Sequence, residues 1–386
     1  MTTRTPLRPA RSDRVPSVAL AGVHGFGRTY VDRLGARAAA GRLRWTGVAE
    51  PRRQDGVVPA QVPWFDALPD LLAAGAPDAV AIATPLPTHA DLAIAALRAG
   101  SHVVLEKPPT TGLAEFAEVL AVARECGRLV QVGFQSLGSA ALDHVRDRVA
   151  RGGVGDVTGY AAAGCWVRPR SYFTRAAWSG RRHLDGRVVA DGVVTNPLAH
   201  ALATALAVAG RTRVEDVTAV QVDPYRVNDI ETDDTTSLVV SLREAPDLVV
   251  AVTLAAAEPG EPFVVVEGTR GRLTLHYTLD VVVEEVPGRP PLVTRHDRFD
   301  LLDDLLGRAA DGGPLRAPLV AAGAFTRVLD AVVTGPAPRA VADAHLRRTP
   351  LPGGDEAVRL VGVEEAVATV LRERRTFAGC GVAWTR

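Results

Sequence analysis

Short apolar runs alternate with helical stretches along the first 135 residues. Strands are predicted at Ser17–Ala21, Leu43–Ala49, Ala79–Ala83, His102–Leu105 and Leu129–Val132. Helices are predicted between them, over about Arg28–Ala40, Leu68–Ala74, Thr88–Ala99 and Leu113–Cys126. Continuous apolar strands that alternate with helices are typical of a parallel sheet covered on both faces. The pattern therefore predicts an α/β, doubly wound Rossmann domain over residues 17–135.

The pattern changes after about residue 150, where apolar and polar positions alternate in closely spaced segments. Strands are predicted at Val157–Val167, Val214–Val222, Thr235–Leu242, Leu248–Leu254, Phe263–Glu267, Arg272–Leu275 and Asp280–Val286. Helices are predicted around Asn196–Ala209, Leu301–Ala310, Ala317–Val333 and Gly354–Arg374. Such a series of strands separated by turn residues favours a large, mostly antiparallel open sheet. Residues 136–386 are therefore expected to form an α+β substrate and oligomerisation domain, whose final helices are candidates for packing back onto the first domain.

The composition argues against several classes of binding partner. Lys+Arg and Asp+Glu both count 44, and this balance argues against a nucleic-acid partner. No apolar run approaches the ~20 residues of a membrane helix. Residues 1–16 contain arginines and prolines and are expected to be a disordered tail rather than a signal peptide. The three cysteines lack the spacing of a metal site, so we expect a reduced, cytoplasmic protein without a bound metal.

A glycine-rich turn, Gly22-Val23-His24-Gly25-Phe26-Gly27, lies between the first predicted strand and helix. A dinucleotide-binding turn needs a tight bend, close backbone approach to the pyrophosphate and a helix N-terminus directed at it. His24 occupies the place of the second glycine of G-x-G-x-x-G, with Gly25 beside it. The position between strand and helix favours cofactor binding by Gly22, His24, Gly25, Phe26 and Gly27 over a turn that binds nothing.

Glu50 ends the second predicted strand, 23 residues after Gly27. A carboxylate there accepts hydrogen bonds from the adenosine ribose and repels a 2′-phosphate, which favours NAD. Arg52 and Arg53 follow at once. They leave NADP as an alternative if their side chains turn inward, and they are otherwise a solvated surface pair.

Lys107 follows the fourth predicted strand, in Glu106-Lys107-Pro108. Ligands of doubly wound sheets bind at the carboxyl ends of the strands, so an ammonium there is placed to bind a substrate hydroxyl and favour its alkoxide. The alternative is a surface lysine at a strand end.

The segment Pro77–Pro85, followed by Pro87-Thr88-His89 and Gly100–Pro108, resembles the Gfo/Idh/MocA oxidoreductase family. The resemblance is strong up to Gln135 and weaker beyond it. It implies an NAD(P)-dependent enzyme whose Lys107 contacts the reacting hydroxyl. It also implies that residues after the third, fourth and fifth predicted strands contact the cofactor. These are Thr84, Pro85, Pro87, His89, Glu106, Lys107 and Gln135.

The family usually carries Asp-x-x-x-His on a helix of the second domain, with the histidine as acid/base. This chain has Asn196 and His200 at that spacing, and positions i and i+4 share one helix face. Since imidazole titrates near neutral pH, His200 is predicted to be catalytic, and the alternative is a buried core histidine. Asn196 replaces the carboxylate and can orient a hydroxyl. Followed by Pro197, it can also simply cap the helix.

A loop rich in aromatic residues and arginine, Trp166–Gly180, offers further substrate contacts. Arg168, Tyr172 and Trp178 are the residues predicted to contact a polyol, with Arg175 nearby. The alternative is a loop that seals a domain edge or a subunit contact. Asp191 or Asp185 can supply the carboxylate that position 196 lacks.

Taken together, these features predict reversible hydride transfer between a nicotinamide and a ring carbinol or ketone carbon. The expected substrate is a small-molecule sugar, sugar derivative or cyclitol, with no nucleic-acid or membrane partner. Two alternatives stay open: an enzyme that uses tightly bound NAD transiently for net elimination or hydrolysis, and a non-catalytic dinucleotide-sensing regulator. A homo-oligomer formed through the sheet of the second domain is also expected.

Overall fold

The computed structural model describes residues 14–386, which divide into two compact units. The first contains the chain up to Phe134 together with Phe299–Val320, and the second contains Gln135–Arg298 and Ala321–Arg386. Most of the predicted disordered tail, residues 1–13, lies outside the described residues. Arg14, which falls within that prediction, instead forms an ion pair with Asp78.

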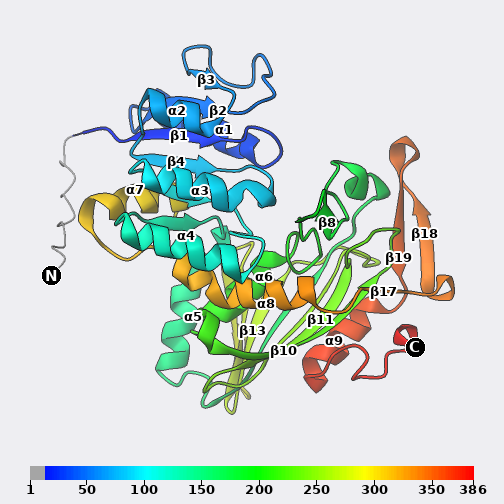
Figure 1. The fold of residues 1–386 in the computed structure, drawn as a ribbon. Coiled ribbons are helices and arrows are strands. Elements are labelled where there is room, and N and C mark those ends of the chain that lie inside the picture. Colours follow the sequence, from blue (N-terminus) through cyan, green and yellow to red (C-terminus); the bar gives the residue numbers. More distant parts are fainter. Residues whose placement is uncertain (1–13) are drawn as a thin grey trace. The chain divides into compact units, whose positions relative to one another are not determined.

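The first unit contains a six-stranded parallel sheet in the order β3-β2-β1-β4-β5-β6 (Figure 1). Its strands are β1 (Ser17–Ala21), β2 (Arg44–Ala49), β3 (Trp64–Phe65), β4 (Ala79–Ile82), β5 (His102–Leu105) and β6 (Val130–Val132). The predicted doubly wound parallel sheet is confirmed. β3 was not predicted, because two residues are too short to give a hydrophobic period.

Helices cover both faces of this sheet. They are α1 (Gly27–Ala39), α2 (Leu68–Ala74), α3 (His89–Arg98), α4 (Leu113–Glu125) and α7 (Leu301–Asp311). Leu34 of α1 and Leu305 of α7 belong to one buried cluster with Val18 and Leu20 of β1, so α1 and α7 share a face. α3 packs between α2 and α4.

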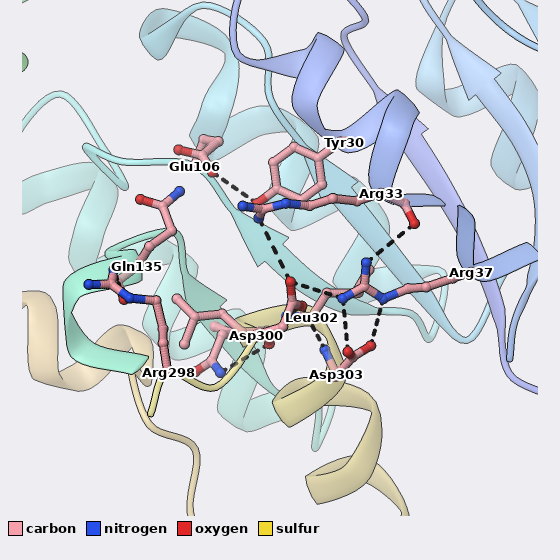
Figure 2. A network of polar contacts seen from close by, with 11 residues as sticks. Tyr30, Arg33, Arg37, Glu106, Gln135, Arg298, Asp300, Leu302 and Asp303 are labelled. Carbon is pink, nitrogen blue, oxygen red and sulfur yellow. Dashed lines mark hydrogen bonds and ion pairs between the residues drawn. The ribbon is translucent and has the colours of Figure 1, made fainter. Parts of the chain in front are cut away.

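The returning helix α7 is attached to the first unit by charge as well as by apolar packing. Arg37 of α1 contacts Asp303 at 2.7 Å and Asp300 at 2.9 Å (Figure 2). The side chain of Gln131 on β6 donates to Asp304 at 2.7 Å and accepts a hydrogen bond from the backbone of Ala317 at 2.9 Å. The segment that returns to the first unit is therefore Phe299–Val320, whereas the final helix lies in the second unit.

The second unit contains a nine-stranded sheet in the order β16-β15-β14-β13-β7-β12-β11-β10-β17. Its strands are β7 (Val157–Cys165), β10 (Val217–Arg226), β11 (Thr235–Leu242), β12 (Leu248–Thr253), β13 (Phe263–Gly268), β14 (Gly271–His276), β15 (Val281–Glu285), β16 (Leu292–Arg295) and β17 (Arg339–Ala340). The β7–β12 and β10–β17 pairs are parallel and the others are antiparallel. The predicted large, mostly antiparallel sheet is confirmed.

Helices lie on both faces of the second sheet as well: α5 (Ala140–Ala150), α6 (Ala199–Val208), α8 (Gly323–Thr334) and α9 (Val363–Glu373). The prediction of one helix over Gly354–Arg374 was wrong in its first part. There the chain forms β19 (Glu356–Leu360), which pairs with β18 (Leu346–Pro350). A second small hairpin joins β8 (His183–Leu184) to β9 (Arg187–Val188). α5 was not predicted.

The C-terminal segment covers the middle of one face of this sheet. Ala163, Val249 and Ala251 pack in one cluster with Phe377 and Trp384. The apolar residues of the edge strand β16 are exposed, Leu292 to 56% and Val293 to 62%. The homo-oligomer expected through this sheet stays a prediction. Within residues 14–386, no helix has the length and apolar character needed to cross a bilayer.

Candidate functional site

The glycine turn between β1 and α1 is built for close backbone approach. Gly22 has φ +86°, and an added Cβ would lie 2.7 Å from the carbonyl oxygen of Ala83. A Cβ on Gly27 would lie 2.3 Å from the carbonyl oxygen of Gly22, whereas one on Gly25 would meet no atom within 4 Å. Two glycines thus hold the turn against the sheet and the third leaves open space in front of it. This arrangement fits the pyrophosphate of a dinucleotide.

His24 and Phe26 lie at the surface of the same turn. His24 Nε2 lies 3.4 Å from the carbonyl oxygen of Arg52 and 3.8 Å from Glu50 Oε1. Phe26 is 46% exposed, and its ring meets Tyr30 edge-on with centroids 6.0 Å apart. Neither side chain is locked into the core, so both can adjust to a ligand.

Glu50 lies at the end of β2 and is buried. Its Oε1 accepts a hydrogen bond from the backbone nitrogen of Arg52 at 3.1 Å. The Arg52 side chain is exposed, with Nε 3.7 Å from Glu50. The Arg53 guanidinium lies 5.9 Å from the ring centroid of Trp64. The buried carboxylate is therefore bonded within the turn, while the exposed Arg52 side chain pairs with it and Arg53 lies over the Trp64 ring.

The loop after β4 carries three of the predicted cofactor residues, Thr84, Pro85 and Pro87, and His89 begins the helix that follows it. Thr84 Oγ1 lies 2.7 Å from the hydroxyl of Thr88, and Thr88 donates to the carbonyl oxygen of Pro85 at 2.8 Å. Pro87 lies in the short helical turn Leu86–Thr88.

His89 is buried beneath this loop. Its Nδ1 lies 2.8 Å from the carbonyl oxygen of Pro108 and its Nε2 lies 2.9 Å from that of Thr84. Burial lowers the pKa of this imidazole. Both ring nitrogens thus face backbone carbonyls, so His89 ties the loop after β4 to the loop after β5.

Glu106 is buried beside the backbone of Lys107. Its carboxylate accepts a hydrogen bond from the Tyr30 hydroxyl at 2.9 Å (Figure 2). It also accepts one from the Lys107 backbone nitrogen at 3.2 Å. A Cβ on Gly133 would lie 2.5 Å from Glu106 Oε1, so only glycine leaves room for this carboxylate. Burial raises the pKa of Glu106 to about 6. The Lys107–Pro108 peptide bond is cis.

Lys107 is the one partly exposed residue in a buried segment. From Val103 to Thr110 every residue is buried except Lys107, which is partly exposed. The first unit thus presents a single side chain at the end of β5.

His200 is likewise the one residue that is not buried in a buried segment of the second unit, the helix α6. Nine of the ten residues of α6 are buried, and His200 is the exception. Its Nδ1 lies 3.3 Å from the Ser136 hydroxyl, and the Thr204 hydroxyl donates to Ser136 at 2.8 Å.

Asn196 departs from its predicted geometry. The helix begins at Ala199 with Leu198 in the N-cap position, so Asn196 is not the helix cap and does not share a helix face with His200. It lies in the turn before the helix, where its backbone nitrogen donates to the carbonyl of Gly192 at 2.9 Å. Its side-chain nitrogen donates to Asp191 Oδ1 at 2.6 Å.

Asp191, one of two proposed suppliers of the missing carboxylate, is buried at the centre of a polar cluster. Besides Asn196, it accepts hydrogen bonds from the backbone nitrogen of Gly180 at 2.8 Å and from Arg175 at 3.3 Å. Burial raises the pKa of Asp191. The other proposed supplier, Asp185, is exposed in the turn of the β8–β9 hairpin, with φ +51°.

The predicted substrate loop forms a stack of arginine and aromatic side chains. The Arg168 guanidinium lies 4.7 Å from the ring centroid of Trp166 and 5.2 Å from that of Tyr172. Arg175 lies 3.8 Å from the centroid of Tyr172 and 4.6 Å from that of Trp178. Since Arg175 also binds Asp191, the structure connects Arg168, Tyr172 and Trp178 to Asn196.

Gln135 begins a short helical turn, Gln135–Gly138, in the second unit. Its carbonyl accepts a hydrogen bond from Arg298, and its side-chain nitrogen is buried with no hydrogen-bond partner among the described residues. A buried donor of this kind is available to a ligand.

Three residues at these sites were missed from the sequence: Tyr30, Ser136 and Thr204. Thr204 left a signal, because it is the single hydroxyl in the apolar run Ala201–Val208 and stands four residues after His200. Tyr30 and Ser136 left none, since their partners are 76 and 64 residues away.

The first unit matches a known protein family. Residues 17–134 match the GFO_IDH_MocA family, described as an oxidoreductase family with an NAD-binding Rossmann fold. A dTDP-3,4-didehydro-2,6-dideoxy-alpha-D-glucose 3-reductase of Streptomyces violaceoruber is 40% identical over 94 residues, 24% of this chain and 27% of that protein. An inositol 2-dehydrogenase of Rubrobacter xylanophilus is 34% identical over 148 residues, 37% of this chain and 42% of that protein. The chain thus aligns with less than half the length of each of these relatives.

The fold likeness extends over both units. The crystal structure of the WlbA dehydrogenase from Bordetella pertussis, in complex with NADH and UDP-GlcNAcA, aligns with a TM-score of 0.68 at 19% identity. The alignment covers 83% of this chain and 95% of that one. Residues 17–134 of this chain thus match the Gfo/Idh/MocA oxidoreductase family over its NAD-binding Rossmann domain.

Proposed function

We propose that this chain is an NAD-dependent oxidoreductase that transfers a hydride between the nicotinamide and a ring carbinol or ketone carbon of a sugar, sugar derivative or cyclitol. The relatives named above support the substrate class, because one reduces a nucleotide-linked deoxysugar and another oxidises inositol, as their names state. NAD, when bound, supplies the hydride acceptor.

The observation that carries the proposal is the identity and setting of Lys107. The chain has 44 Lys and Arg residues, and Lys107 is its only lysine. It stands at the one partly exposed position between Val103 and Thr110. An ammonium is a compact charge that can exchange a proton, whereas a guanidinium stays protonated and forms a planar fork. All other residues of this pair of types are arginine, and the one lysine stands where a compact charge can polarise a single substrate oxygen.

The proposed proton transfer uses His200. During oxidation, the substrate hydroxyl gives its proton to Nε2 of His200 while the hydride leaves the same carbon, which becomes a carbonyl carbon. Lys107 binds the oxygen and stabilises the negative charge that develops there. In reduction the same groups act in reverse, and His200 returns the proton to the oxygen.

Substrate orientation is assigned to the polar cluster in the second unit. Asp191 accepts a hydrogen bond from the side-chain nitrogen of Asn196 and so orients the amide that we assign to a substrate hydroxyl. Arg168, Tyr172 and Trp178 offer an aromatic surface with guanidinium donors, which suits a polyol ring or an attached anionic group.

Glu50 is assigned to the adenosine ribose, and this favours NAD over NADP. The buried carboxylate stands at the end of β2, where it repels a 2′-phosphate. Arg52 is the residue that would accept that phosphate if Glu50 were neutralised.

The test is reduction of NAD by the purified protein with a panel of cyclitols, free sugars and nucleotide sugars. We expect an increase in NADH absorbance with at least one member. The Lys107→Arg variant keeps the positive charge but replaces the compact ammonium by a planar guanidinium that does not lose its proton. It should bind NAD and lose this turnover. Full turnover in that variant, or no turnover by the wild type with any member of the panel, would refute the proposal.

A further inference from the structure

The glycine turn of the first unit carries an imidazole where a dinucleotide-binding turn usually has no side chain. His24 stands in the place of the second glycine of G-x-G-x-x-G. Its Nε2 lies 3.8 Å from Glu50 Oε1 and 3.4 Å from the carbonyl oxygen of Arg52. The side chain at position 24 therefore lies beside the carboxylate that the proposed function assigns to the adenosine ribose.

We infer that His24 and Glu50 together set the coenzyme preference of this turn. The neutral imidazole leaves the Glu50 carboxylate to repel the 2′-phosphate of NADP, whereas the protonated imidazole offsets that repulsion and admits NADP as well as NAD. The inference rests on the proposed function as an NAD-dependent oxidoreductase. It adds a specificity residue that makes the choice of coenzyme depend on pH.

Three groups meet the same oxygen of Glu50. Oε1 accepts a hydrogen bond from the Arg52 backbone nitrogen at 3.1 Å, and it lies 3.7 Å from Arg52 Nε and 3.8 Å from His24 Nε2. Within residues 14–386, Glu50 is the one carboxylate in ion-pair range of His24. The Glu50 side chain is 8% exposed and the His24 side chain is 36% exposed. The carboxylate is thus held within the fold, while the imidazole beside it can exchange a proton with solvent.

The charge of this cluster changes by one unit when His24 takes up a proton. Glu50 and Arg52 carry opposite charges, so the cluster is neutral while the imidazole is neutral and positive when it is protonated. A 2′-hydroxyl carries no charge, whereas a phosphate monoester carries up to about two negative charges. The pyrophosphate is common to both coenzymes, so its attraction to His24 cancels when their affinities are compared. The added positive charge therefore favours NADP over NAD.

Other charged or titratable groups on the segments around the turn keep their charge or are buried. Arg28, in the first turn of α1, is exposed and stays protonated. Arg53 pairs with the exposed Asp55 at 3.8 Å. The loop after β4 packs against the glycine turn, and His89 at its end is buried with both ring nitrogens at backbone carbonyls. His24 is thus the exposed imidazole of this region.

The test is direct binding of both coenzymes to the purified protein, without substrate. Affinities for NAD and NADP are measured by calorimetric titration from pH 8 to pH 5.5, the range in which an imidazole takes up its proton. In the wild type NAD should bind more tightly at pH 8, and the ratio of affinities should move toward NADP as pH falls. In His24→Asn this movement should be smaller by roughly three- to tenfold, the size expected for one charge in a partly exposed site.

His24→Asn separates the imidazole from other groups that titrate in this range. It keeps Glu106, whose pKa is raised by burial to about 6, and it leaves unchanged the 2′-phosphate, whose second ionisation also lies at about pH 6. Any remaining difference from the wild type is then due to His24.

Two further variants match this one. His24→Arg carries a charge that does not titrate, so at pH 8 it should bind NADP more tightly than the wild type does. It should also show no more dependence on pH than His24→Asn. His183→Asn, in the exposed turn region of β8 in the second unit, removes a histidine elsewhere and should follow the wild type.

The outcomes for the inference and for the proposed function are distinct. An equal movement of the ratio in wild type and His24→Asn would overturn the inference, as would NADP binding in His24→Arg that is no tighter than in the wild type at pH 8. NAD binding would persist in both cases, and the proposed function would stand. If neither coenzyme binds the wild type at any pH, the proposed function fails and the inference fails with it.

Discussion

The two units hold their predicted catalytic residues by different means. Lys107 is held largely by a neighbour in its own motif, because its backbone N–H donates a hydrogen bond to the Glu106 carboxylate. That carboxylate also accepts a hydrogen bond from Tyr30 and lies against Gly133. His200 is instead supported by the hydroxyls of Ser136 and Thr204. A buried carboxylate thus stands beside the lysine, whereas neutral groups stand behind the histidine.

The group beside Lys107 can change its charge with pH, whereas the hydroxyls beside His200 stay neutral. Burial raises the pKa of the Glu106 carboxyl to about 6, so this group changes its charge near pH 6. Ser136 and Thr204 do not ionise, so the groups behind His200 carry no charge that changes with pH. Variants of Glu106 should therefore make stability depend differently on pH, whereas variants of His200 should change proton transfer.

The largest expected effect comes from the two predicted catalytic side chains. Lys107→Met and His200→Asn should each lower turnover with the active polyol by ~10²-fold or more, since each removes an electrostatic or acid/base group. NAD affinity, measured by fluorescence titration, should change little in both. Loss of NAD binding in His200→Asn would contradict its assignment to proton transfer.

The glycine turn should respond next. In Gly27→Ala the new Cβ would lie 2.3 Å from the carbonyl oxygen of Gly22, so the turn must open. We expect a loss of about 1–3 kcal/mol in the free energy of unfolding and much weaker NAD binding. Gly35→Ala, in the same helix, is the matched control, because its Cβ would meet nothing nearer than Trp45 at 4.0 Å. That control should bind NAD normally.

Glu106 should make stability depend on pH. Its pKa is raised from 4.5 to about 6 on folding, so the folded protein holds a proton that the unfolded chain releases. The resulting stabilisation is complete below pH 4.5 and is lost as pH rises through 6, by ~2 kcal/mol in all. Denaturant unfolding of wild type and Glu106→Gln from pH 4 to 7 measures this. A constant difference between the two would show that Glu106 does not titrate as described.

The smallest effect is expected at Asp191, which orients Asn196 and Arg175. Asp191→Asn should raise the KM for the polyol by about tenfold, the loss expected for one charge-assisted hydrogen bond, with a smaller change in kcat. Asp185→Asn, in the exposed hairpin turn nearby, is the control and should leave the KM unchanged. Equal effects in both variants would count against a specific role for Asp191.

The first unit could be predicted almost completely from the sequence, because its site residues follow strands in contiguous motifs. Gly22 to Gly27 follow β1, Glu50 follows β2, and Lys107 follows β5, each placed by the strand that precedes it. The missing pieces are Tyr30, the short strand β3 and the segment Phe299–Val320, which was expected in the second domain. All three are fixed by tertiary contacts that no local pattern records.

The second unit was less predictable, because its site depends on irregular backbone. The apolar run after His200 predicted a helix correctly, but the spacing of Asn196 and His200 suggested one helix face, and the turn before Ala199 removes that relation. The contact between Asp191 and Asn196 follows from that turn. The Arg175 stack likewise depends on a loop whose conformation hydrophobic periodicity does not describe.

The central claim is that a hydride passes between a ring carbon and NAD, and isotope transfer tests it most directly. The protein is incubated with NAD and the active polyol deuterated at its ring carbons, and the coenzyme is analysed by mass spectrometry. We predict singly deuterated NADH and the matching ketone in equal amounts, with neither formed by Lys107→Met. Conversion of the substrate with the coenzyme returned as unlabelled NAD would contradict net oxidoreduction and favour transient use of the cofactor.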